Sequence, residues 1–203
     1  MSGVPALLQL AALQCERAGQ ALFAPIDLNL VPGDCVELIG PNGVGKSTLL
    51  RTLAGLHDSY RGSLKVEDFI YQGHRLGLDE SRTALDNLRW HAQLGEHPVD
   101  ESELAALLKQ VGMLGFALTP VAHMSAGQKR RVAMARWRLG KQRVWLLDEP
   151  ATALDTAALE LLQQALVGHC ESGGVVVYAT HQALALPHKQ TLQLQTLVAE
   201  ATL

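Results

Sequence analysis

Cysteine is scarce in this chain of 203 residues, and long apolar runs are missing from it. The three cysteines, Cys15, Cys35 and Cys170, are unevenly spaced and form no CxxC pair. They argue against a disulfide framework and a zinc site, and they fit a reducing compartment. No apolar run approaches the ~18 residues that a membrane-spanning helix requires. We therefore expect that the chain does not enter a membrane by itself.

Charge is also lacking where a targeting signal would need it. The stretch Met1–Leu8 has no charged region ahead of its apolar residues, so we expect no secretory signal. The formal net charge is −3, with 48% hydrophobic and 18% charged residues. This balance gives no general argument for nucleic acid or an anionic membrane surface as a partner. The length fits one domain with an inserted subdomain.

The most informative stretch that is present fits the phosphate-binding pattern G-x-x-x-x-G-K-[ST] without a mismatch. An apolar run that indicates a buried strand precedes it, and a helical pattern follows it. Strand, glycine loop and helix start aim backbone N–H groups and the positive end of the helix dipole at one point, which favours a nucleoside triphosphate. The expected site residues are Gly40, Pro41, Asn42, Gly43, Val44, Gly45, Lys46, Ser47 and Thr48.

Each residue type in this loop has a chemical reason. The glycines allow close backbone approach to an anion. Lys46 supplies a mobile positive charge for the β- and γ-phosphates, and the Ser47 hydroxyl can ligate Mg²⁺. An ordinary glycine-rich turn is the alternative. The loop alone does not choose among kinases, GTPases and transport ATPases.

Strand and helix signals alternate along the chain. Residues 8–72 are rich in strand signals and residues 83–140 in helix signals, after which buried strands return. This order predicts an α/β core with a phosphate loop, interrupted by a helical insertion. The expected strands are Leu8–Leu13, Ile26–Leu30, Cys35–Ile39, Ser63–Val66, Phe69–Tyr71, Val144–Leu147 and Val175–Ala179, and the expected helices are Ala84–Leu94, Glu101–Gly112 and Thr156–Cys170.

Two adjacent acids, Asp148 and Glu149, follow the apolar run 144–147. They would lie at the carboxyl end of a strand, where α/β sheets place ligands. There Asp148 would hold Mg²⁺ and Glu149 would act as general base on the attacking water. An exposed acidic pair that caps the next helix is the alternative, which the preceding apolar residues disfavour. His181 follows a strand that should neighbour this pair, where it can contact the γ-phosphate, although a lone histidine there is usually structural.

Ser125 has the character of a helix N-cap before a long basic helix, and the following Ala126 and Gly127 allow close backbone approach. By itself, a plain helix cap is the better interpretation of this segment. A further short segment, Ala153-Leu154-Asp155, lies just past the acidic pair. The basic run over residues 129–143 is interpreted as the solvated or phosphate-facing side of one helix, in preference to a nucleic-acid patch.

The chain resembles the ATP-binding subunit of an ABC transporter over nearly its whole length. The resemblance rests on five motifs and on their order along the chain: GPNGVGKST, SAGQ, LLDEP, ALD and the histidine after VVYAT. The resemblance implies one ABC ATPase domain, 1–203, with a RecA-like P-loop core at 1–72 and 141–203 and a helical subdomain at 73–140. It also implies that the ligands are ATP and Mg²⁺, with the metal bound at Ser47 and Asp148. Glu149 and His181 would be the catalytic residues.

The same resemblance implies partners. Two copies would form a homodimer that sandwiches ATP between Lys46 of one copy and Ser125, Ala126, Gly127 and Gln128 of the other, with Asp155 coupling the two sites. Integral membrane permease subunits would dock near residues 72–90. The complex would lie at the cytoplasmic face of the inner membrane, with this subunit peripheral and without nucleic acid as a partner.

Two positions depart from the family pattern. Such ATPases usually place an adenine-stacking aromatic near residues 15–18, which are Cys15, Glu16, Arg17 and Ala18 here. The base is therefore expected to be held loosely or by Arg17. Counting back from Thr83, His74 occupies the position of the usual Mg²⁺-sensing glutamine, with Gln72 as the second candidate.

The small size and the segments 71–74 and 83–88 look most like the ATP-binding subunits of the bacterial cytochrome c maturation system, whose membrane partners handle haem export. The sequence has no CxxCH haem-attachment pattern. The ATPase subunit of another small ABC importer or exporter would share every motif. A soluble ABC protein acting on ribosomes or DNA usually has two cassettes or a long insertion, and a kinase or GTPase needs an acceptor or guanine motif not found here.

Overall fold

The computed structural model describes residues 4–94 and 100–197, and the chain divides into two compact units. The first unit comprises Met1–Gly73, Gln142–Glu149 and Val167–Leu203, and the second comprises His74–Lys141 and Pro150–Leu166. Residues 150–166 fall in the second of these units, whereas the family resemblance implied that they belong to the core, and the implied domain division stays a prediction. Within the second unit, Asp155 of this segment accepts an ion-paired hydrogen bond from Arg131, 2.9 Å between Nη2 and Oδ2.

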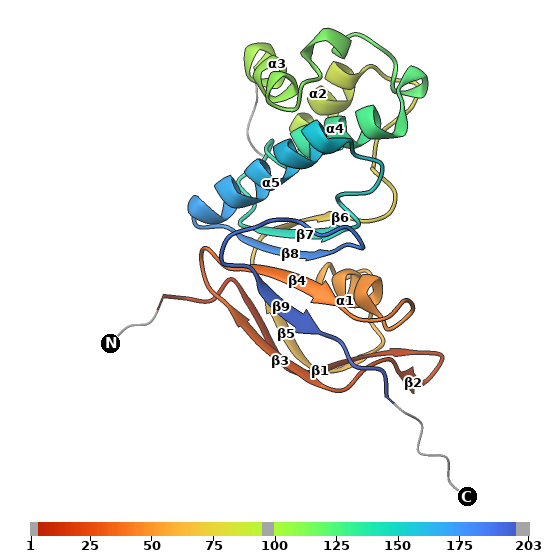
Figure 1. Cartoon of the computed structure of the whole chain (residues 1–203), viewed down its shortest axis with the longest axis vertical. Helices are drawn as coiled ribbons and strands as arrows, with labels where there is room; N and C mark the ends of the chain where they lie inside the picture. Colours follow the sequence, from red (N-terminus) through yellow and green to blue (C-terminus); the bar gives the residue numbers. More distant parts are fainter. Residues whose placement is uncertain (1–3, 95–99, 198–203) are drawn as a thin grey trace, which may run out of the picture. The chain divides into compact units, whose positions relative to one another are not determined.

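The first unit contains a five-stranded parallel sheet in the order β6-β7-β8-β4-β9 (Figure 1). Strands β7 and β8 are buried along their whole length, which is why their sequences are nearly continuous apolar runs. The register pairs Asp148 with Ala179, so that the ends of β7 and β8 lie side by side. The strands are β4 (Cys35–Ile39), β6 (Phe69–Gln72), β7 (Val144–Asp148), β8 (Val175–Ala179) and β9 (Gln190–Gln193).

The second sheet of this unit is antiparallel and has four strands. Helix α1 (Lys46–Leu53) contacts β7 and β8 of the parallel sheet and β1 and β5 of the antiparallel sheet. Figure 1 shows α1 between the two sheets, and its Leu49 and Leu50 are fully buried there. The antiparallel strands are β1 (Leu8–Arg17), β2 (Gln20–Ala21), β3 (Ile26–Leu30) and β5 (Tyr60–Val66).

The second unit is built from helices. Helices α2, α3 and α4 contact one another, and buried leucines such as Leu88, Leu104 and Leu108 fill the space between them. Asp100 caps α3 by accepting a hydrogen bond from the N–H of Glu103 at 2.8 Å. The helices are α2 (Ala84–Leu94), α3 (Glu101–Gln110), η1 (Leu114–Phe116), η2 (Val121–His123), α4 (Ala126–Arg136) and the first part of α5 (Thr156–Glu171).

The expected strands and helices are confirmed, with changes at their ends. Strand β1 continues to Arg17 because its last two residues pair with β2, and β5 begins at Tyr60, opposite Cys15 of β1. Two strands, β2 and β9, were not expected: one has two residues, and the other is a polar edge strand that pairs with β4 alone. Over the described residues, the helices are too short or too polar for any of them to cross a bilayer.

The interpretation of the basic run as the solvated or phosphate-facing side of one helix is wrong for Arg130 and for the members after Arg136, where α4 ends. Arg130 is buried, at 7% exposure. Lys129 forms an ion pair with Glu80, and Arg131 pairs with Asp155. These contacts direct much of the positive charge of α4 toward other parts of the same chain.

Candidate nucleotide-binding site

The loop after β4 is held from outside by two segments far away in the sequence. A Cβ on Gly40 would lie 2.8 Å from the carbonyl oxygen of Leu194, and Gly40 has φ +146°. A Cβ on Gly45, at φ +114°, would lie 3.1 Å from the ring of Phe23. Side chains do not fit at either glycine, so the loop keeps a bare backbone path into the start of α1. The sequence pattern did not single out Phe23 or Leu194, since each acts through its place in the fold.

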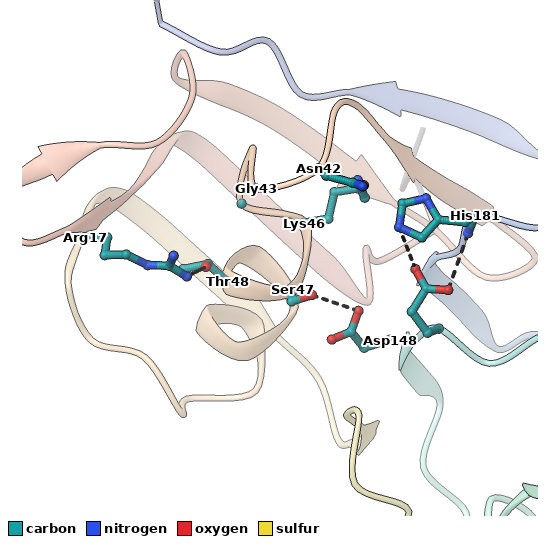
Figure 2. Close-up of a pocket in the computed structure, with 10 residues that line it drawn as sticks. Arg17, Asn42, Gly43, Lys46, Ser47, Thr48, Asp148 and His181 are labelled. Carbon is teal, nitrogen blue, oxygen red and sulfur yellow. Dashed lines mark hydrogen bonds and ion pairs between the residues drawn. The ribbon is translucent and has the colours of Figure 1, made fainter. Parts of the chain in front are cut away.

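A cavity of about 220 Å³ opens beside this loop, within the first unit. Figure 2 shows the loop residues on one side of it and Asp148 and His181 on the other. Most of the expected loop residues line it, whereas Gly40, Pro41 and Val44 do not, and Val44 is buried in the core. The lining residues are Arg17, Asn42, Gly43, Gly45, Lys46, Ser47, Thr48, Asp148, Glu149 and His181.

Lys46 is the first residue of α1 and is only 8% exposed. Its Nζ donates to the carbonyl oxygens of Gly40 and Pro41, at 2.8 and 3.2 Å. A buried ammonium group needs such partners, because desolvation of an unpaired charge is costly. Phosphate oxygens are stronger acceptors than these neutral carbonyls, so an arriving triphosphate can replace them as partners.

The Ser47 hydroxyl donates to Oδ1 of Asp148 at 3.0 Å, which joins the start of α1 to the end of β7 (Figure 2). Asp148 is 6% exposed. A hydroxyl and a carboxylate oxygen are the ligand types that Mg²⁺ prefers, and this ion usually takes its other ligands from phosphate and water. The described residues contain no cluster of three His, Cys, Asp or Glu side chains suited to a metal. The donor set fits Mg²⁺ delivered together with a nucleotide.

Glu149 follows directly and has a left-handed backbone, φ +54°. Its N–H donates to the carbonyl oxygen of Ala179 at 2.8 Å, which ties this conformation to the end of β8. Its carboxylate lies beside His181, with Oε1 3.5 Å from the ring Nε2 and Oε2 3.4 Å from the backbone nitrogen. The structure thus brings together the two residues expected to be catalytic, at one wall of the cavity.

The two candidates for a Mg²⁺ sensor lie in different surroundings. Gln72 is 1% exposed at the end of β6, paired in register with Leu147, the residue before Asp148. Its Nε2 donates to the carbonyl oxygen of Gly73 at 2.9 Å. His74 is exposed and belongs to the second unit. Neither side chain lines the cavity.

The Ser125 segment lies in the second unit, where the expected helix cap is confirmed. Ser125 Oγ accepts from the N–H of Gln128 at 3.2 Å, and Gln128 Oε1 accepts from the N–H of Ser125 at 2.9 Å. A Cβ on Gly127 would lie 2.8 Å from the carbonyl oxygen of Ala153. This glycine therefore lets the start of α4 approach the Ala153-Leu154-Asp155 segment, while Ser125 and Ala126 stay exposed.

Arg17 is the residue of the 15–18 segment that lines the cavity. Its Nη2 donates to Oγ1 of Thr48 at 3.3 Å. Among the described lining residues there is no phenylalanine, tyrosine or tryptophan. The planar guanidinium is thus the one group of that segment placed to meet a ligand here.

Comparisons with known proteins show the family of this chain. The family model described as "ABC transporter" matches residues 23–152. The "Cytochrome c biogenesis ATP-binding export protein CcmA" of Saccharophagus degradans is 40% identical, over 90% of this chain and 91% of its own. The protein of that name from Vibrio parahaemolyticus is 36% identical, over 87% and 92%.

Solved structures agree as well. A putative ABC transporter ATP-binding protein from Pyrococcus furiosus superimposes with a TM-score of 0.82 at 21% identity, over 92% of this chain and 96% of that one, and shows the fold. The "Structure of ATP binding subunit of ABC transporter" gives a TM-score of 0.80 at 25% identity, over 93% and 86%. With its fold, its cavity and its relatives in agreement, this chain belongs to the ABC transporter family as an ATP-binding subunit, an ATPase most like the CcmA proteins.

Proposed function

We propose that this chain hydrolyses ATP to power haem export in a cytochrome c maturation complex, at the cytoplasmic face of the inner membrane. Support comes from the curated relatives, whose printed names describe ATP-binding export proteins of cytochrome c biogenesis, at about 40% identity over about 90% of the chain. The alternative is the ATPase subunit of another small ABC importer or exporter, which the same cavity would serve equally well.

One observation carries the hydrolytic part of the proposal. The Ser47–Asp148 contact and the Glu149–His181 pair lie in one cavity, beside a loop that presents backbone N–H groups and a lysine. Phosphoryl transfer needs positioning and charge stabilisation more than covalent chemistry, and this cavity offers both.

Each side chain has a role in the proposed reaction. Lys46 releases its two carbonyl partners and binds the β- and γ-phosphate oxygens, while the N–H groups at the start of α1 bind the same anion. Glu149 accepts the proton of the attacking water. His181 donates an N–H to the γ-phosphoryl group and keeps the Glu149 carboxylate oriented. When bound at Ser47 and Asp148, Mg²⁺ offsets the charge on the phosphates.

The proposal includes a second copy of the chain. The cavity of about 220 Å³ is smaller than the roughly 300–1,000 Å³ of pockets that enclose a ligand by themselves. In a two-fold dimer, Ser125, Ala126, Gly127 and Gln128 of the partner copy would close over the γ-phosphate. This role is supported by the position of these residues at an exposed helix N-terminus, which favours anions. Asp155 would couple the two sites, because it binds Arg131 in the same helix, α4.

Purification of the native complex from membranes tests this proposal. We expect the chain to co-purify with integral membrane subunits docked near residues 72–90, and ATP hydrolysis by the complex to require haem-system subunits for full rate. Co-purification with permease subunits that carry another substrate would establish the alternative. Recovery of the chain alone, with no membrane subunit bound, would contradict both.

A further inference from the structure

The loop before α2 is held in place by other parts of the second unit, to which it belongs. We call residues 77–83 the bridging loop. None of its residues lines the nucleotide cavity. Its backbone is nevertheless bound at several points by side chains of α2 and α4 and by the backbone of residues 121–122. A loop that needed only to connect two elements would not require so many hydrogen-bond partners.

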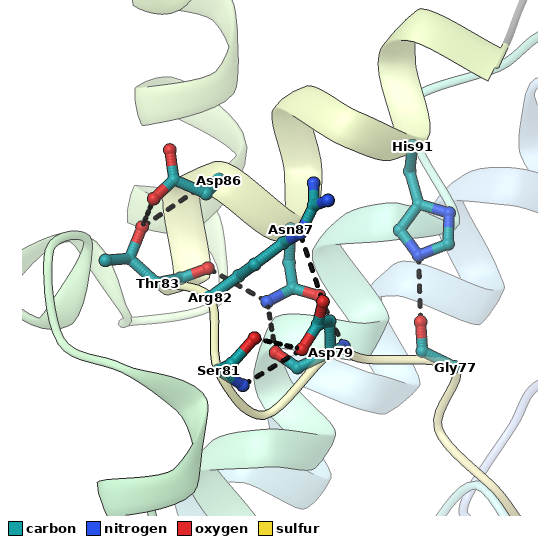
Figure 3. A network of polar contacts seen from close by, with 8 residues as sticks. All are labelled: Gly77, Asp79, Ser81, Arg82, Thr83, Asp86, Asn87 and His91. Carbon is teal, nitrogen blue, oxygen red and sulfur yellow. Dashed lines mark hydrogen bonds and ion pairs between the residues drawn. The ribbon is translucent and has the colours of Figure 1, made fainter.

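Asn87 on α2 is the first of these partners, at 1% exposure. Its Nδ2 donates to the carbonyl oxygens of Asp79 and Thr83, both at 2.9 Å, and its Oδ1 accepts from the N–H of Asp79 at 2.8 Å (Figure 3). Both donor hydrogens and the acceptor of this amide are therefore used on the bridging loop. Moving the loop away from α2 would leave buried polar groups unpaired, which is costly.

The carbonyl oxygen of Gly77 is bound from two helices. His91 lies four residues after Asn87 on the same face of α2, and its Nε2 lies 2.9 Å from this oxygen (Figure 3). Nη1 of Arg136, on α4, donates to the same oxygen at 3.3 Å. Burial lowers the pKa of His91, against the hydrogen bond to Gly77, which raises it, and with the charge of Arg136, which lowers it. Because a carbonyl oxygen can only accept, Nε2 carries the hydrogen of this bond. A Cβ at Gly77 would lie 2.3 Å from Nη1 of Arg136, and Gly77 has φ +66°, a backbone conformation that favours glycine.

The bridging loop is also bonded to the segment that leads into α4. The carbonyl oxygens of Glu80 and Arg82 accept from the N–H groups of Ala122 and Val121, both at 2.9 Å. The carboxylate of Glu80 accepts from Nζ of Lys129, in the first turn of α4, at 2.6 Å. The short helix η2 ends at His123, two residues before the Ser125 cap. The loop is therefore bonded to both ends of α4.

We propose that Asn87, His91 and Arg136 act as positioning residues that lock the bridging loop to α2 and α4. When a docked membrane subunit displaces the loop, Ser125–Gly127 then move with it. This is the segment that contacts the nucleotide bound by the partner copy. This inference deepens the proposed function and rests on it, because it needs a membrane subunit near residues 72–90. Its physical content is that the loop, η2 and the start of α4 move as one body.

Hydrogen–deuterium exchange of the full chain tests the physical link. His91→Leu removes one of the two donors to the Gly77 carbonyl oxygen, and His91→Gln supplies an amide donor in its place. We expect exchange of the amides of Val121 and Ala122 to rise roughly three- to tenfold in the first variant, as the net loss of one hydrogen bond predicts, and to return to the wild-type rate in the second. Gln93→Leu, a matched change on an exposed position of the same helix, should leave these amides unchanged. Faster exchange in the loop without any change at residues 121–122 overturns the link.

Hydrolysis by the complex with its membrane subunits tests the function of the lock. His91→Leu should keep nucleotide affinity, co-purification with the membrane subunits and the basal hydrolysis rate of the isolated chain. It should lose about fivefold or more of the stimulation that the membrane subunits give, within the range of ordinary coupling between sites, and His91→Gln should restore it. Full stimulation in His91→Leu, or loss of co-purification instead of stimulation, overturns the inference. If the wild-type chain itself neither co-purifies nor is stimulated, the proposed function has failed.

Discussion

Glu149 has a backbone conformation that residues other than glycine rarely adopt, φ +54°, at the end of a fully buried strand. Such a conformation costs about 1–3 kcal/mol and persists when the surroundings enforce it, which is common at functional sites. Here the N–H of Glu149 is bound by the carbonyl oxygen of Ala179, and the side chain lies against His181. The strain therefore places a carboxylate where an attacking water would need a base.

Replacement of Glu149 by glutamine tests this role. Glu149→Gln keeps the size and shape of the side chain but removes the basic oxygen, so we expect phosphate release to slow by about 10²-fold or more. Nucleotide affinity should stay within about twofold of wild type in a fluorescent-nucleotide titration, because Lys46 and the loop are untouched. Glu160→Gln, on an exposed position of α5, is the control and should hydrolyse normally. Near-normal turnover in Glu149→Gln would remove this residue from the role of base.

The Mg²⁺ sensor is a second question at the residue scale. We propose His74 as the residue that senses Mg²⁺. Gln72 is the second candidate, because it is buried on the strand next to the one that carries Asp148. Hydrolysis rates of His74→Ala and Gln72→Ala are compared across a Mg²⁺ titration. The residue that contacts the metal is expected to require a severalfold higher Mg²⁺ concentration for half-maximal rate when it is replaced. An unchanged Mg²⁺ profile for His74→Ala removes His74, and an unchanged profile for both removes the sensor from this segment.

At the scale of elements, the sequence predicts best those features that depend on interactions between residues close together in the chain. The strand Val175–Ala179 and the phosphate loop are set by neighbours in sequence, and both are where the pattern predicts them. Contacts between segments far apart in sequence leave no local pattern. The packing of Phe23 against Gly45 and the burial of Arg130 could be found only from the fold.

The same distinction applies within the site. Asp148 and Glu149 were identifiable because an apolar run delivers them to the carboxyl end of a buried strand, and their proposed roles come from the family resemblance. The bonds of Asn87 to Asp79 and of His91 to Gly77 join a helix to the loop before it. In the sequence, Asn87 and His91 look like ordinary polar residues of a helix, because no local pattern indicates that their side chains form hydrogen bonds with backbone groups of the loop.

The start of α4 provides a prediction at the element scale, since Ser125 has a structural role and a proposed functional one. Ser125→Ala removes the capping hydrogen bond and should lower the free energy of unfolding by about 1 kcal/mol. Ser125→Asp keeps a good capping group but adds a negative charge toward the proposed γ-phosphate position. We therefore expect near wild-type stability in Ser125→Asp, with hydrolysis by the dimer reduced about tenfold or more, because like charges repel.

Chemical denaturation and phosphate release measured on the two Ser125 variants separate these roles. A pure helix cap would make Ser125→Asp as active as the wild-type protein. A nucleotide contact in the partner site makes Ser125→Asp less active than its stability predicts. Normal hydrolysis in Ser125→Asp at high protein concentration would contradict the partner-site role.

At the scale of the whole molecule, the proposed catalytic parts are divided between the two units. Every residue that lines the nucleotide cavity belongs to the first unit, whereas Ser125–Gln128 belong to the second. A dimer in which each copy offers its α4 start to the nucleotide of the other would complete two cavities at once, as a two-fold interface does. Triphosphate then acts as the ligand that favours the closed dimer over separate subunits.

Light scattering coupled to gel filtration tests this arrangement with the Glu149→Gln chain, in which slow hydrolysis preserves bound ATP. We expect a monomer without nucleotide or with ADP, and a dimer with saturating ATP and Mg²⁺, because the γ-phosphate supplies the contacts shared by both copies. Adding Ser125→Asp to Glu149→Gln should return the protein to a monomer while a fluorescent analogue still binds. A chain that remains monomeric with saturating ATP, even with its membrane subunits present, would show that each cavity works without the partner's α4, and the shared site would have to be abandoned.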